Sequence, residues 1–176
     1  MNILDNLLED YKREDYNYIL DMALAISSDD PNVMDSLTLA LDKPKQYFKT
    51  NAKRFDERFI DFEDEDLEDE FELEDLFFLA MVDELQEHGH LFEVDWKCSL
   101  EDFLWALQQL KNYNMISNVI SSVKLDEKLE VDVWIEKINE ALGGKAYVCY
   151  TDIDSDSYPL IIVDSKVYKM IHESDS

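Results

Sequence analysis

The chain has 176 residues, 42 of them acidic and 16 basic, and its formal net charge at pH 7 is −26. Apolar residues make up 46% of it and aromatic residues 12%, a composition too rich in apolar side chains for a disordered acidic tail. A field of this sign repels nucleic acid and anionic membranes and attracts basic surfaces. We therefore expect no direct contact with nucleic acid or membrane, and a single folded domain over residues 1–176.

Targeting and redox signals point to the cytoplasm. Residues 1–15 carry acids where a signal peptide needs positive charge. The longest strongly apolar run, Leu76–Val82, is far too short for a membrane span. Cys98 and Cys149 belong to no C-x-x-C pair, so we expect both to be reduced thiols.

The first part of the chain predicts helices. Apolar residues recur at helical spacing over 3–26, as one long helix or two short ones, and Pro31 begins another helix that runs to about Leu41. Pro44 opens a third helix with one apolar stripe, formed by Phe48, Ala52, Phe55, Phe59 and Phe62. Residues 43–55 hold five basic residues, which include Lys45 and Arg54, and no acid, and they favour ion pairs within the chain over contact with nucleic acid.

The most distinctive segment is an acidic run over residues 56–75, which has thirteen acids and one basic residue, Arg58. Apolar residues interrupt it, which a solvated tail would not need. We expect an acidic loop at 61–70 and a helix over 70–87 with Leu73, Phe77, Ala80 and Met81 facing the core. The predicted partner-binding residues are Asp61, Phe62, Glu63, Asp64, Glu65, Asp66, Leu67, Glu68, Asp69, Glu70 and Phe71.

The second half mixes strands and helices. Alternating residues predict a strand near 91–97, and Ser99 with Asp102 predicts a capped helix start. Residues 115–123 are ambiguous between helix and strand. Residues 127–142 predict a helix that ends at Gly143. Strands near 146–151 and 159–164 predict a hairpin, and a short helix at 165–173 follows it. The fold class is α+β: a mostly helical single domain with a small, three-stranded antiparallel sheet.

Chemical motifs are weak. Asp152, Asp154 and Asp156 stand at positions 1, 3 and 5 of a calcium-type loop, but the glycine at position 6 is missing and position 12 is Val163. These three are weak metal candidates, and a turn bonded to its own backbone is the simpler interpretation. No catalytic residue is assigned and no cofactor is expected.

Two further groups are candidate chemical sites. His88 and His90, with Cys98 nearby in sequence, lack a second pair at zinc spacing. Glu93 and Asp95 are the nearest approach to a catalytic carboxylate pair, but a plain exposed strand face is the better explanation of them.

Two stretches carry a family resemblance. The first runs from Met81-Val82-Asp83-Glu84-Leu85 through Glu93-Val94-Asp95-Trp96-Lys97 to Leu107, and the second from Tyr150-Thr151-Asp152 to Tyr158-Pro159-Leu160. Over residues 81–107 and 147–163 the chain resembles an uncharacterised family of small acidic bacterial proteins. The resemblance implies no activity. It suggests that Asp95-Trp96 and residues 152–158 form one structural unit at neighbouring strand ends.

Three functions remain open. The first is a non-enzymatic cytoplasmic protein that binds a basic partner, such as a toxin or nuclease, in the manner of an immunity protein or a DNA-mimicking inhibitor. The second is an enzyme with a carboxylate or metal site around Asp95, Asp152, Asp154 and Asp156. The third is a housekeeping or adaptor domain whose charge serves solubility alone. The sequence predicts no oligomeric state.

Overall fold

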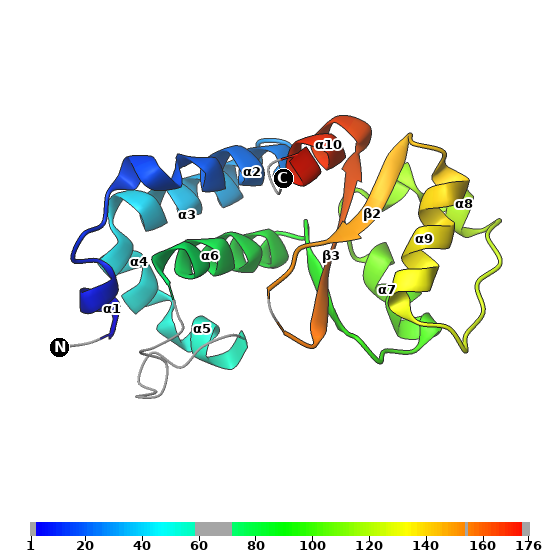
Figure 1. Cartoon of the computed structure of the whole chain (residues 1–176), viewed down its shortest axis with the longest axis horizontal. Coiled ribbons are helices and arrows are strands. Elements are labelled where there is room, and N and C mark those ends of the chain that lie inside the picture. The colour runs from blue at the N-terminus through cyan, green and yellow to red at the C-terminus, as the bar shows by residue number, and fades with distance from the viewer. Residues whose placement is uncertain (1–2, 59–71, 154, 174–176) are drawn as a thin grey trace. The chain divides into compact units, whose positions relative to one another are not determined.

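A computed structural model describes residues 3–58, 72–153 and 155–173 (Figure 1). The helices and one three-stranded antiparallel sheet confirm the predicted α+β class. Contacts divide the chain into two compact units, Met1–Leu85 and Gln86–Ser176, which we describe one at a time. The expectation of one domain stays a prediction. The acidic loop at 61–70, all the predicted partner-binding residues and Asp154 lie outside the described residues.

The first unit is built from helices in its described part. Its elements are α1 (Ile3–Leu7), the 3₁₀ turn η1 (Arg13–Tyr16), α2 (Asn17–Ser27), α3 (Pro31–Asp42), α4 (Pro44–Thr50), α5 (Ala52–Arg58) and α6 (Leu73–Glu87). The Asp30 side chain accepts a hydrogen bond from the Asn32 amide and Pro31 follows it, so α3 begins where the sequence predicts.

Residues 3–26 follow the two-helix alternative, whereas the single helix predicted after Pro44 is broken in the structure. Residues 3–26 form α1 and α2 with η1 between them, and the Tyr11 hydroxyl turns inward to donate to the Leu41 carbonyl at 2.7 Å. The helix after Pro44 breaks at Asn51, whose side-chain amide donates to the Tyr47 carbonyl and so competes with the helical backbone. Phe48 and Phe55 remain buried and in edge contact across this break. Phe59 and Phe62 lie outside the described residues.

Helix α6 is buried on more sides than its sequence predicts. Leu73 is only half-buried, whereas Phe77, Ala80 and Met81 are fully covered as expected. Two acidic side chains of α6, Asp83 and Glu84, are also buried. The Phe77 ring contacts aromatic rings of η1 and α4, so α6 forms part of the core of the first unit.

The second unit holds the sheet. Its elements are β1 (Phe92–Asp95), α7 (Leu100–Gln108), the 3₁₀ turn η3 (Tyr113–Met115), α8 (Ser117–Ile120), α9 (Val131–Leu142), β2 (Ala146–Tyr150), β3 (Ser157–Asp164) and α10 (Ser165–Glu173). The strand order is β1-β3-β2 with both pairs antiparallel, which confirms the predicted hairpin. Ser99 accepts from the Asp102 amide as the capping motif predicts, and left-handed Gly143 ends α9.

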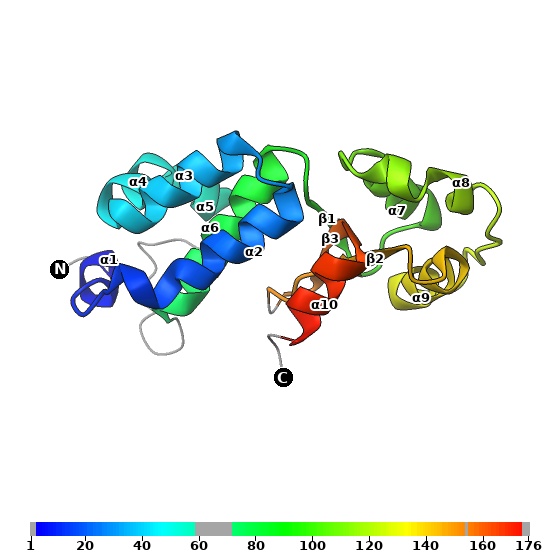
Figure 2. The ribbon, with the colours of Figure 1, turned by 90° about the horizontal axis from the view of Figure 1, so that it is seen from above.

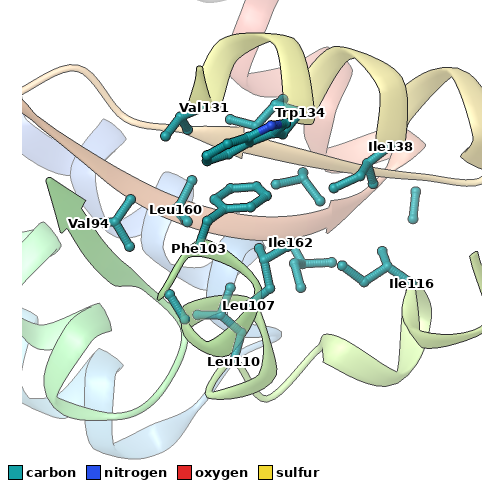
Figure 3. Packing of buried hydrophobic residues seen from close by; sticks show 14 of the residues in the cluster. Val94, Phe103, Leu107, Leu110, Ile116, Val131, Trp134, Ile138, Leu160 and Ile162 are labelled. Atoms are coloured by element: carbon teal, nitrogen blue, oxygen red, sulfur yellow. The ribbon is translucent and has the colours of Figure 1, made fainter. Parts of the chain in front are cut away.

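The core of this unit lies between the sheet and helices α7 and α9, while α10 lies against the opposite face (Figure 2). Val94, Leu160 and Ile162 project from the strands into this core (Figure 3). Phe103 of α7 packs on Trp134 of α9 with ring centroids 5.3 Å apart. The Trp134 indole donates to the Asp126 carbonyl at 2.8 Å, which satisfies its polar atom inside an apolar cluster.

The outer edge of β2 is closed by one side chain. β2 is an edge strand, and its Val148 amide and carbonyl both bond the Asn139 side chain of α9 at 2.8 Å. An open strand edge can pair with a strand from another chain. At the middle of β2 the Asn139 side chain occupies the Val148 amide and carbonyl, which prevents such pairing there. Among the helices of the described chain, none has both the length and the apolar character that a membrane crossing requires.

Candidate functional site

Buried ion pairs join the two helices that flank the acidic run. Asp83 of α6 is fully buried and receives the guanidinium groups of Arg54 and Arg58, both from α5. Arg54 also contacts Glu84 at 3.0 Å. A buried carboxylate is costly unless it is paired and hydrogen-bonded, so this network explains how two acids stand in the core of α6. The prediction of ion pairs for the basic helix is confirmed at Arg54.

A tyrosine completes this network. The Tyr47 hydroxyl donates to the Glu84 carboxylate in the buried interior. Burial, followed by the charge and hydrogen bond of Glu84, raises the pKa of Tyr47 above its usual range. The hydroxyl therefore stays protonated and acts as a donor. The network links α4, α5 and α6, and we assign it a structural role.

The C-terminal part of the acidic run lies within the described residues. Glu72, Glu74 and Asp75 are exposed at the start of α6. The Asp75 carboxylate accepts from the Glu72 amide at 3.1 Å, the backward bond of a capping box. Acids at this end of a helix also interact favourably with its dipole, by about 0.3–1 kcal/mol each. Here the acidic run therefore has a fixed local structure.

Two tyrosines lie beside these acids. The Tyr18 hydroxyl of α2 donates to the Glu74 carboxylate at 3.2 Å, and the Tyr18 side chain is 38% exposed. Tyr16 of η1 stacks at a tilt on Phe77, with centroids 4.9 Å apart. We call this group the acid–tyrosine surface. It comprises Tyr16, Tyr18, Glu72, Glu74 and Asp75.

Both tyrosines of the surface stay protonated at physiological pH. Burial and then the charge of Glu74 raise the pKa of Tyr18 above its usual range. Burial, then the charge of Asp15, also raises the pKa of Tyr16. Each hydroxyl is thus a neutral donor among carboxylates. The sequence analysis missed these tyrosines, because their partners lie more than fifty residues away and no local pattern connects them.

In the second unit, the end of β1 and the start of β3 lie side by side, as the family resemblance suggests. Asp95 pairs with Ser157 in the register of β1 and β3, and the Trp96 amide donates to the Asp156 carbonyl at 3.0 Å. This confirms that Asp95-Trp96 and residues 156–158 lie at neighbouring strand ends. The Asp95 side chain accepts from the Lys97 amide at 2.8 Å, so it serves its own turn.

The described carboxylates of the enzyme hypothesis, which do not include Asp154, do not gather into a metal site. Asp95, Asp152 and Asp156 are all exposed. Within residues 3–58, 72–153 and 155–173 there is no group of three or more His, Cys, Asp or Glu side chains that could hold a metal ion. Glu93 instead accepts a hydrogen bond from the Ser157 hydroxyl. The arrangement is that of strand-end turns.

Neither cysteine has the surroundings of a nucleophile. Both thiols are free; Cys98 is half-buried and Cys149 is buried. Burial, then the charges of Asp102 and Asp95, raises the pKa of the Cys98 thiol. Burial alone raises the pKa of the Cys149 thiol to about 12. A nucleophilic cysteine is favoured by a lowered pKa, and both of these pKa values are raised, so the structure supports neither thiol as a nucleophile.

A second tyrosine–carboxylate cluster lies at one end of the sheet. Tyr150 and Tyr158, with centroids 4.5 Å apart, both donate to the carboxylate of Asp132, at 3.3 and 3.0 Å. Burial, followed by the hydrogen bond to Asp132, raises the pKa of Tyr158 to about 12. This cluster joins the start of α9 to β2 and β3, which stabilises the hairpin.

The fold and these sites define an acidic α+β protein whose polar clusters stabilise structure or lie on the surface. The chain belongs to the family described as a domain of unknown function, DUF6630, whose model matches residues 19–173. This confirms the resemblance to an uncharacterised family and extends it into the first unit. Comparison with curated proteins found no match, and comparison with solved structures also found none.

Proposed function

We propose that this chain is a non-enzymatic binding protein that engages a basic protein through the acid–tyrosine surface and the acidic run that leads into it. The observation that carries the proposal is the hydrogen bond from the exposed Tyr18 to Glu74. It places a large aromatic ring beside clustered carboxylates, so that one surface offers both a hot-spot residue and charge complementary to a basic partner.

The two kinds of side chain contribute differently to binding. Carboxylates at the rim of an interface mainly raise the association rate and select the sign of the partner. Tyrosine is enriched among the residues that carry binding free energy, because its ring buries a large area and its hydroxyl still bonds. Tyr16 and Tyr18 are half-buried and exposed respectively, so both can contribute in this way.

The acidic run extends the surface in sequence. Acids from Asp61 to Glu70 precede Glu72 in the sequence, with Phe71 between Glu70 and Glu72. In the proposal they act as phosphate surrogates, and Phe62, Leu67 and Phe71 supply apolar contacts. The partner that fits is a protein with a basic active site, such as a nuclease toxin, which places this chain among immunity proteins or DNA-mimicking inhibitors. A bacterial cytoplasm is consistent with this role, and its reducing conditions are consistent with the free thiols.

A capture experiment with matched variants tests the proposal. The full chain and a Glu72→Gln/Glu74→Gln variant are immobilised and exposed to host extract at low salt. A Glu136→Gln/Glu140→Gln variant, which neutralises two exposed acids on α9, changes the net charge equally at another place. The proposal predicts a basic protein retained by wild type and by the α9 variant and depleted on the first variant.

The control also separates local recognition from general charge. Equal retention on all three proteins would mean that the acid–tyrosine surface has no part in binding. If no basic protein is retained at low salt on any of them, the charge serves solubility alone, as in the third hypothesis, and the proposal is wrong.

A further inference from the structure

Trp105 on α7 is the most exposed large apolar side chain among the described residues, at 53%. Phe92 of β1 meets its ring edge-on, with centroids 5.3 Å apart and planes at 88°. This contact fixes the indole against the strand while about half of the side chain faces solvent. A rigid, half-exposed tryptophan has the properties of a binding hot spot, because little conformational freedom is lost when it is covered.

The surroundings of Trp105 are acidic. Glu101 precedes it by one helical turn, so the two side chains are neighbours on the outer face of α7, and both are exposed. Helix α7 itself contains two acids, Glu101 and Asp102, and no lysine or arginine. The exposed indole therefore lies in a negative local field.

The same unit already shows how a cation binds such a ring. The ammonium of Lys97 lies over the Trp96 ring, 4.5 Å from its centroid. The Trp96 ring therefore already contacts a cation of its own chain. The Trp105 ring contacts Phe92 instead. A cation over an indole is attracted by the ring face, and the attraction strengthens when water is excluded.

We infer that Trp105 and Glu101 form a second docking point, on the second unit, for an arginine side chain of a basic protein partner. A guanidinium can stack flat on the indole and direct its N–H groups to the neighbouring carboxylate, which a lysine ammonium does less well. The inference rests on the proposed function, because it assumes the same basic protein partner. It adds that the partner presents an arginine at this point. It uses a surface remote in sequence from the acidic run.

Short peptides probe this docking point directly. A nona-arginine peptide, a nona-lysine peptide and a glycine–serine peptide are titrated into the full 15N-labelled chain at low salt. The indole N–H resonances of Trp96, Trp105 and Trp134 are followed, assigned by Trp→Phe variants. The buried Trp134 indole is bonded to Asp126 and serves as the internal reference.

The expected result is a shift of the Trp105 resonance with nona-arginine, a smaller one with nona-lysine, and no shift of Trp134. Trp105→Ala or Glu101→Gln should weaken nona-arginine binding about two- to five-fold, as one exposed cation–π contact predicts. Met170→Ala, which removes another exposed apolar side chain of the second unit, should leave it unchanged.

The outcomes separate this inference from the proposed function. If nona-arginine binds, and Glu72→Gln/Glu74→Gln weakens it while the Trp105 resonance stays in place, the docking point is wrong and the function stands. If neither arginine nor lysine peptide binds at low salt, both are wrong. Equal shifts of Trp105 with arginine and lysine would overturn the assignment of arginine.

Discussion

The Tyr18 hydroxyl donates a hydrogen bond to the Glu74 carboxylate, 3.2 Å away in space and 56 residues away in sequence. The bond joins α2 to the first turn of α6, where the acidic run ends. An aromatic side chain and a carboxylate are thereby held in one orientation before any partner arrives. This preorganisation lowers the entropic cost of forming an interface.

The first prediction concerns the ring and the hydroxyl of Tyr18. Tyr18→Ala should weaken binding of the basic partner more than Tyr18→Phe, because the ring supplies most of the buried area and the hydroxyl only orients Glu74. Titration calorimetry with the captured partner measures both. Leu39→Ala, at another exposed apolar position of the first unit, is the control. Equal effects of the Ala and Phe variants would contradict a role for the ring.

The second prediction concerns the buried ion pairs. Asp83→Asn removes the charge that Arg54 and Arg58 share, and should lower the free energy of unfolding by about 2 kcal/mol or more. The figure is at the low end of buried pairs because both arginines retain some exposure. Chemical denaturation followed by circular dichroism measures it.

An exposed pair in the same unit provides the comparison. Lys53 and Glu57 are 3.9 Å apart and both are exposed, so Lys53→Met should change stability by no more than about 0.5 kcal/mol. Similar effects for Asp83→Asn and Lys53→Met would show that the buried network does not hold α5 to α6.

The third prediction concerns the edge of β2. Asn139→Ala leaves the Val148 amide and carbonyl without the side chain that bonds both, which should cost about 1–3 kcal/mol. The open edge should also promote self-association, visible by light scattering at high concentration. Asn118→Ala, at an exposed position of α8, should do neither. A monomeric and fully stable Asn139→Ala protein would contradict this account of the edge.

The fourth prediction concerns the order in which the thiols react. Cys98 is half-buried and Cys149 is buried with a pKa of about 12, so a thiol reagent at pH 8 should label Cys98 first. The raised pKa of Cys149 also contributes stability that is intact below pH 9 and is lost as the pH rises toward 12, because the folded state holds that proton more tightly. Mass spectrometry of labelled peptides checks the order, and faster labelling of Cys149 would contradict it.

Local patterns in the sequence predicted most of the second unit. Alternation marked the strand near Val94, a run of β-favouring residues marked the strand near Ile162, and Ser99 and Gly143 marked the ends of helices. These signals act over a few residues, where sterics and capping bonds decide the backbone. The adjacency of Asp95 and residues 156–158 came from family resemblance and proved correct.

Interactions between distant residues were harder to predict. Asp83 and Glu84 made α6 look amphipathic, because sequence alone does not show that arginines on another helix neutralise them. Asn51 ends α4 through a side-chain bond that competes with the helix, an effect that apolar periodicity does not register. Tyr18 was missed as a site residue because its significance depends on Glu74.

The most direct test of the central claim is the affinity for the captured basic partner, measured by titration calorimetry at low and at physiological salt. The account predicts that Glu72→Gln/Glu74→Gln weakens binding roughly two- to thirty-fold at low salt, with a smaller effect at higher salt, while Glu136→Gln/Glu140→Gln has little effect. If the two variants lose the same affinity, or neither loses any, the acid–tyrosine surface is not the binding site.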